Sequence, residues 1–132
     1  ASRALTHELV RHRIASYSQR SQRYVRELQA DYITPPEFED KNSEAAKIFH
    51  ESMSAAWSSY RKLLDAGMKP EIARYVLPNA CMTEIICTWN FREIRHILKL
   101  RTSPAALPEI REVAHKIADI MKEQAPKVFG DL

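Results

Sequence analysis

The sequence predicts an α+β fold that is predominantly helical, with its helices packed on a small antiparallel sheet. Most of the 132 residues fall in segments whose apolar residues recur every three or four positions, which is the spacing of an amphipathic helix. About two segments have the composition of strands, fewer than a free-standing sheet usually contains. We therefore expect the sheet to be completed by N-terminal strands that are absent from this chain, with a nearly all-α fold as the alternative.

The first half of the chain is expected to begin with a helix over residues 3–14, because leucines and other branched residues recur there four apart. The polar run at 16–21 indicates a loop. Residues 24–33 fit either a strand or an irregular extended segment. The helix over 43–66 has the longest apolar stripe, with a serine suited to capping its start and a glycine just after its end.

In the second half, Pro70 has the fixed φ that suits the first turn of a short helix over 70–76. Residues 82–89 are rich in β-branched and aromatic side chains and lack a helical stripe, which favours a strand. Helical spacing returns over 91–100. A last helix is predicted from 108 to 126, opened and stopped by prolines.

The formal net charge of +3 conceals an uneven distribution. Positions 1–26 hold six arginines, no lysine and a single acid, Glu8, which gives a local charge of +5. The planar guanidinium group suits two-point recognition of a phosphate or carboxylate, because its N–H groups form a rigid fork. The alternative is a basic helix face that is simply solvated.

Several classes of protein and site are disfavoured by composition. The length fits one domain over residues 1–132, and no change in composition marks a boundary. No apolar run approaches the roughly 20 residues of a membrane span, and no targeting peptide is recognisable, so we expect a cytoplasmic protein. With two glycines, a Rossmann or Walker phosphate loop is excluded. The histidines lack zinc-ligand spacing relative to Cys81 and Cys87, so no metal site is expected.

Two polar clusters and one isolated arginine are candidates for binding an anion. The densest cluster is Arg11-His12-Arg13 followed by Ser21, where a helix end leads into a polar loop. Arg74 lies among apolar neighbours and is expected to be half-buried with an anionic partner. The second cluster follows the predicted strand and consists of Asn90, Arg92, Arg95, His96, Lys99 and Arg101. This spacing does not separate a mononucleotide ligand from a nucleic-acid backbone.

These motifs resemble the signature of flavin-dependent thymidylate synthases. The resemblance rests on Arg11-His12-Arg13, seven further residues, Ser21, and then Arg23-Tyr24. Three more segments are similar to the family in the same order: the Ile-Ala-Arg-x-Val-Leu-Pro run at 72–78, the block at 83–101, and Glu-Ile-Arg at 109–111. Together they cover nearly the whole chain.

The resemblance implies the reductive methylation of dUMP to dTMP. In this family, methylenetetrahydrofolate supplies the carbon and NADPH supplies electrons through FAD, so the cofactors perform the chemistry and the protein binds and orients. The resemblance also implies a homotetramer with shared active sites. The family has several tens of residues upstream of the first helix, so the chain is expected to be a C-terminal portion that is inactive by itself.

Roles are implied for the positions that match the family motifs. Arg101 is implied as the catalytic residue, facing the uracil and stabilising negative charge on it. The residues implied to bind the cofactor are Arg11, His12, Arg13, Gln19, Asn90, Phe91, Arg92 and His96. The residues implied to bind dUMP are Glu8, Arg11, Gln19, Arg20, Ser21, Gln22, Arg23, Arg74 and Arg101. Within this second set, residues 21–23 and Arg74 are implied to hold the phosphate.

The chain departs from the family pattern at three places. Ser18-Gln19 stands where the family usually has Asn-Glu, so a carboxylate is replaced by a neutral amide. Leu107 stands where an amide side chain is usual, and His96 replaces an asparagine of several members.

A basic helical module that binds nucleic acid is the alternative function. Its expected signature is a row of cations along one exposed element, with aromatic residues for base stacking. The arginines here are split among separated segments, and aromatic residues make up only 8% of the chain. The thymidylate synthase hypothesis is therefore preferred, with dUMP and folate as partners and no nucleic acid or membrane.

Overall fold

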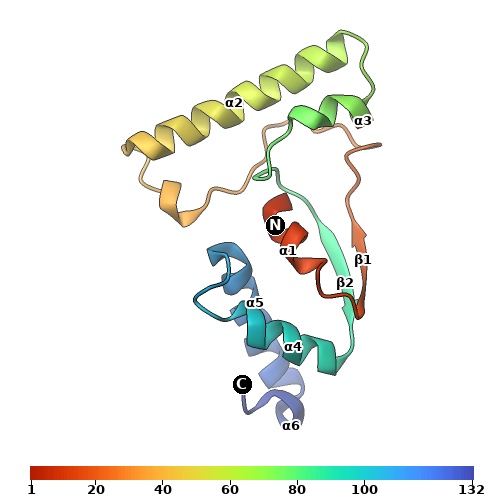
Figure 1. The fold of residues 1–132 in the computed structure, drawn as a ribbon, viewed down its shortest axis with the longest axis vertical. Coiled ribbons are helices and arrows are strands. Elements are labelled where there is room, and N and C mark those ends of the chain that lie inside the picture. Colours follow the sequence, from red (N-terminus) through yellow and green to blue (C-terminus); the bar gives the residue numbers. More distant parts are fainter. The chain divides into compact units, whose positions relative to one another are not determined.

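The computed structural model describes residues 1–132, which divide into two compact units. Unit 1 consists of residues 1–4 and 19–85, and unit 2 of residues 5–18 and 86–132. The predicted α+β class is confirmed, because helices dominate and two strands pair in one small antiparallel sheet (Figure 1). None of the helices is both long enough and apolar enough to cross a lipid bilayer.

Helix α2, Glu44–Asp65, is the longest element of unit 1 (Figure 1). Ser43 caps its first turn, since its Oγ accepts a hydrogen bond from the backbone N–H of Ala46 at 3.1 Å. The chain leaves the helix through Gly67, whose φ of 87° lies in the left-handed region that favours glycine. Both ends agree with the boundaries expected from the sequence.

The apolar core of unit 1 forms around α2. Trp57 and Tyr60 are fully buried on this helix, and Met53 and Cys81 share a cluster with Trp57. The short helix expected at 70–76 is present in two directly joined parts. The smaller helices of unit 1 are η1 (Pro36–Phe38), α3 (Pro70–Ala73) and η2 (Arg74–Val76).

The sheet pairs β1, Ala15–Gln19, with β2, Ile85–Trp89, and most of both strands belongs to unit 2. Exposure alternates along each strand, so every second side chain faces inward. Helix α1, Arg3–Leu9, precedes β1 in the chain, and its buried residues include Leu5.

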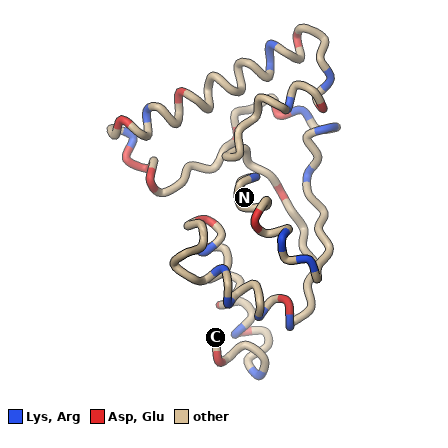
Figure 2. The backbone as a smooth tube through the Cα atoms, viewed as in Figure 1, with Lys and Arg blue, Asp and Glu red and all other residues tan.

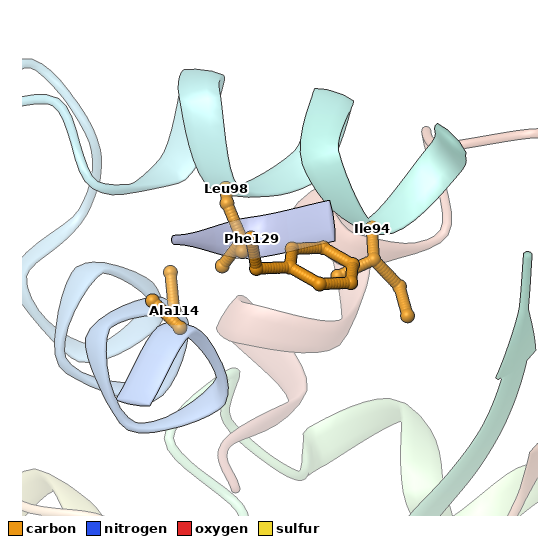
Figure 3. Close-up of a cluster of buried hydrophobic side chains, with 5 residues drawn as sticks. Ile94, Leu98, Ala114 and Phe129 are labelled. Atoms are coloured by element: carbon orange, nitrogen blue, oxygen red, sulfur yellow. The ribbon is translucent and has the colours of Figure 1, made fainter. Parts of the chain in front are cut away.

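The apolar core of unit 2 gathers around Phe129, which is fully buried (Figure 3). Ile94 and Leu98 of α4 and Ala114 of α5 belong to the same cluster. Truncation of a buried phenylalanine such as Phe129 to alanine lowers the free energy of unfolding by about 3–5 kcal/mol. The helices that supply this cluster are α4 (Phe91–Arg101), α5 (Pro108–Gln124) and α6 (Pro126–Phe129).

Three expected elements differ from the structure. The prediction of a loop at 16–21 is wrong, because residues 16–19 belong to strand β1. This strand forms by pairing with β2, which the local composition does not reveal. The first helix ends at Leu9, and the predicted strand over 82–89 begins at residue 85. Residues 24–33 take the irregular alternative, with one isolated bridge from Tyr32 to Cys81.

Candidate functional site

Arg101, at the C-terminal end of α4, makes three hydrogen bonds inside unit 2. Its Nη1 donates to Oε2 of Glu8 at 2.6 Å, its Nη2 to the carbonyl oxygen of Glu8 at 3.3 Å, and its Nε to Nε2 of His12 at 3.1 Å. A guanidinium group carries five N–H groups, so two remain for a ligand. The side chain of Arg101 is 20% exposed, which leaves it accessible from solvent.

The bond from Arg101 fixes the tautomer of His12. Because Nε2 accepts a hydrogen bond, the proton of the neutral ring lies on Nδ1, which is 3.8 Å from Oε1 of the buried Glu93. Burial lowers the pKa of His12 below its ordinary value, and the positive charge of Arg101 lowers it further, while Glu93 opposes the shift. His12 is therefore a neutral, oriented side chain at neutral pH.

Tyr17 and Trp89 fix the backbone that carries His12. The Tyr17 hydroxyl lies 2.9 Å from the carbonyl oxygen of Leu9 and 2.8 Å from that of His12, and donates its proton to them. The same hydroxyl accepts a hydrogen bond from Nε1 of Trp89 at 3.2 Å. It thus ties the last residue of α1 and the following turn to strand β1.

Beside this network, unit 2 has a pocket of about 450 Å³. Figure 2 shows positively charged segments where α1 leads into β1, the part of the chain that holds Arg11 and Arg13. The three guanidinium groups around the pocket outnumber its single carboxylate, so it is suited to an anionic ligand. The residues lining it are Arg11, His12, Arg13, Ile14, Arg92, Glu93 and His96.

Unit 1 brings three arginines together. Nη2 of Arg3 donates to the carbonyl oxygen of Arg20 at 2.8 Å. Burial lowers the pKa of Arg3, the carboxylate of Glu27 opposes this shift, and the cations of Arg74 and Arg20 add to it. Arg74 is half-buried as expected, but in place of the expected anionic partner its Nε donates to the backbone carbonyl oxygen of Glu71 at 3.2 Å. We call Arg3, Arg20 and Arg74 the arginine cluster.

The polar loop after β1 is fixed by its own side chains. The Oγ of Ser21 accepts from the backbone N–H of Arg23 at 3.1 Å. Gln22 is buried, with its Nε2 3.3 Å from Sγ of Cys81. The guanidinium of Arg23 pairs with a carboxylate oxygen of Glu71 at 3.4 Å.

Asn90 and Phe91 have structural roles at the start of α4. Oδ1 of Asn90 accepts from the backbone N–H of Glu93 at 2.8 Å and so caps the helix. Phe91 packs edge-on against Phe129, with ring centroids 5.4 Å apart, although half of its surface is exposed. The exposed part of Phe91 leaves room for a ligand contact as well.

The structure distributes the expected site residues over both units. Sequence reasoning missed Tyr17, Trp89, Glu93 and Glu27, because nothing in their local spacing distinguishes them from ordinary strand or surface residues. Unit 2 holds Glu8, Arg11, His12, Arg13, Asn90, Phe91, Arg92, His96 and Arg101. Unit 1 holds Gln19, Arg20, Ser21, Gln22, Arg23 and Arg74.

Comparison with known proteins gives a consistent result. A family model described as thymidylate synthase complementing protein matches residues 1–127. The flavin-dependent thymidylate synthase of Clostridium tetani is 44% identical over 97% of this chain, which covers 57% of that protein. The flavin-dependent thymidylate synthase of Geobacter sulfurreducens is 44% identical over 98% of this chain, covering 56% of that protein. The chain thus spans less than three fifths of these relatives.

Two solved structures are also similar. Thymidylate synthase X from Helicobacter pylori, crystallised with FAD and dUMP, has a TM-score of 0.78 and 30% identity, covering 99% of this chain and 68% of that one. A UMP/dUMP methylase from Streptomyces cacaoi, bound to 5-bromo-dUMP, has a TM-score of 0.86 and 26% identity, covering 98% of this chain and 67% of that one.

Proposed function

Because this chain belongs to the family described as thymidylate synthase complementing protein, we propose that it forms part of a flavin-dependent thymidylate synthase. The proposed reaction is the reductive methylation of dUMP to dTMP, with methylenetetrahydrofolate and NADPH as co-substrates and FAD as cofactor. The observation that carries the proposal is the fixed guanidinium of Arg101, with two N–H groups left for a ligand.

The pocket of unit 2 fits a cofactor with phosphate groups. Its arginines, Arg11, Arg13 and Arg92, offer forked donors to the diphosphate of FAD, while His12 and His96 supply ring N–H groups. FAD, when bound, supplies the transfer of electrons from NADPH that the reductive methylation requires. The protein's part is to bind and orient this cofactor.

Arg101 acts on the uracil ring in this proposal. A fixed cation stabilises negative charge as it develops on the ring, and it needs no reorientation when Glu8 and His12 already hold it. Glu8 keeps one carboxylate oxygen without a hydrogen bond to Arg101, so it can also contact the nucleotide. Gln19, whose Nε2 lies 3.4 Å from Oγ1 of Thr83, is proposed to contact both nucleotide and cofactor.

The phosphate of dUMP is assigned to unit 1. The arginine cluster supplies positive charge, and the loop of Ser21, Gln22 and Arg23 supplies hydrogen-bond donors. The mutual repulsion of the arginines is relieved when an anion binds, which favours a dianionic phosphate over a neutral group. We extend the proposal to a cytoplasmic homotetramer with shared active sites.

The proposal is tested with the protein at its full natural length. We expect it to purify yellow, to gain thermal stability with dUMP, and to form dTMP only when NADPH and methylenetetrahydrofolate are both present. Colourless protein that ignores dUMP and binds DNA with a strong salt dependence would overturn the proposal in favour of a nucleic-acid module.

A further inference from the structure

Glu27 is a buried acid of unit 1 that has no part in the function proposed so far. Glu27 is 5% exposed, its Oε1 is buried without a hydrogen-bond partner, and its Oε2 lies 3.6 Å from Nη2 of Arg20. Its backbone N–H donates to the hydroxyl of the fully buried Tyr60 at 3.3 Å. A buried carboxylate has lost most of its hydration and is stable only where cations compensate.

The compensating cations belong to the arginine cluster. The charge of Glu27 favours the charged form of Arg3, against the burial of Arg3 and the repulsion from Arg74 and Arg20. Without a bound anion, several guanidinium groups held this close would repel one another and turn toward solvent. Glu27 supplies negative charge from the buried side of the cluster and so keeps it assembled.

Arg20 is held in a way that suits it for contact with a ligand. Its backbone N–H donates to the carbonyl oxygen of Glu84 at 2.9 Å, and its own carbonyl oxygen accepts from Arg3. Its side chain is 38% exposed, although the carboxylate of Glu27 beside it is almost completely buried. One side of the guanidinium therefore faces Glu27, and the rest can face solvent.

We propose that Glu27 is a positioning residue for the nucleotide phosphate, acting by holding Arg20 from its buried side. This inference rests on the proposed function, in which unit 1 binds the phosphate of dUMP. Because backbone and side chain of Arg20 are both restrained beforehand, less conformational entropy is lost when the phosphate binds. The Arg23–Glu71 pair of the same unit differs, since both of its side chains are more than a third exposed and are screened by water.

The test separates the phosphate from the rest of the nucleotide. Binding of dUMP and of deoxyuridine, which lacks the phosphate, is measured by calorimetry for the wild type and for Glu27→Gln at full natural length. The dissociation constant of deoxyuridine divided by that of dUMP reports the contribution of the phosphate to binding. We expect this ratio to fall about tenfold in Glu27→Gln, at the lower end of what a lost hydrogen bond to a charged group costs. KM for dUMP should rise while kcat is retained.

Three further variants make the result specific. Glu51→Gln removes an exposed carboxylate from the same unit and should leave the ratio unchanged. In an Arg20→Ala background, Glu27→Gln should have no further effect, because its influence passes through Arg20. If Glu27→Gln does not fold, Glu27→Asp gives the same comparison, since its shorter side chain keeps the charge but retracts it from Arg20.

An unchanged or increased ratio in a folded Glu27 variant would overturn the inference, as would an equal loss for dUMP and deoxyuridine. Thermal melting provides a second readout. Glu27→Gln removes one partner of a buried ion pair and leaves the arginine cluster without its counter-charge, so the free energy of unfolding should fall. Failure of the proposed function looks different, because the wild type itself would then bind dUMP no better than deoxyuridine.

Discussion

Replacing Arg101 by alanine tests how the network of unit 2 works. The variant removes three hydrogen bonds. Their acceptors are Oε2 of Glu8, the backbone carbonyl oxygen of Glu8 and Nε2 of His12. It also removes a cation that lowers the pKa of His12. We therefore expect two separate effects, a loss of turnover and a rise in the pKa of His12, while the flavin still binds.

The two effects of Arg101→Ala differ in size from its effect on stability. A fixed donor for developing charge contributes about 100- to 1000-fold in kcat, or about 3–4 kcal/mol of transition-state free energy. The ion pair with Glu8 contributes much less to folding, because the two side chains are 20% and 34% exposed and partly screened. A pair of this kind contributes about 1 kcal/mol or less to the free energy of unfolding.

The assay for Arg101→Ala combines steady-state dTMP formation, flavin absorbance of the purified protein and an NMR titration of His12. Arg95→Ala is the matched control, because Arg95 lies on the same helix but pairs with Asp131 at 2.6 Å, outside the Arg101 network. Arg101→Lys should keep part of the effect on His12 but lose turnover, since an ammonium group cannot form the same fork. Near-normal turnover of Arg101→Ala would refute the catalytic assignment, and an unchanged pKa of His12 would refute the network.

Three further outcomes are expected. Tyr17→Phe leaves Nε1 of Trp89 without its acceptor and should lower the free energy of unfolding by about 1–2 kcal/mol in urea denaturation; an unchanged midpoint would contradict this. Burial raises the pKa of Cys81 from 9.0 to about 11, so alkylation of this thiol near pH 8 should be roughly 100-fold slower than for an exposed cysteine, and fast labelling of Cys81 would oppose it. The folded-state pKa of His12 lies below its ordinary 6.5, so the unfolded state binds more protons and the free energy of unfolding should fall as pH drops below 6.5. His12→Gln should weaken that dependence, and identical pH profiles would exclude His12 as its source.

Local signals in the sequence were sufficient for the long helix and for the family. Ser43 and Gly67 mark the ends of α2 because a cap and a left-handed residue act within one helical turn. The motif around His12 and Arg101 was sufficient to identify the family, since the family model matches residues 1–127. Both kinds of signal are contained in short stretches of sequence.

Features that depend on distant partners were not predictable. Strand β1 is polar in composition, and its conformation comes from pairing with β2 about 70 residues later in the chain. The hydroxyl of Tyr17, which bonds the carbonyl oxygen of Leu9 at the end of α1, is in turn held by Trp89, 72 residues away. The backbone of Glu27 is likewise held by a distant partner, the hydroxyl of Tyr60 on α2. Charge and spacing alone do not distinguish such residues from solvated ones.

The two arginine–carboxylate pairs, Arg101–Glu8 and Arg20–Glu27, are built in opposite ways, and this difference matches the proposed roles. In the first pair the arginine is the less exposed partner, 20% against 34% for Glu8. In the second the arginine is 38% exposed and Glu27 only 5%. A fixed cation that is less exposed to water acts more strongly on charge that appears only in the transition state. A cation open to water, held from its buried side, suits the reversible binding of a phosphate that is charged throughout the reaction. Changes at Arg101 should therefore appear mainly in kcat, and changes at Glu27 mainly in KM.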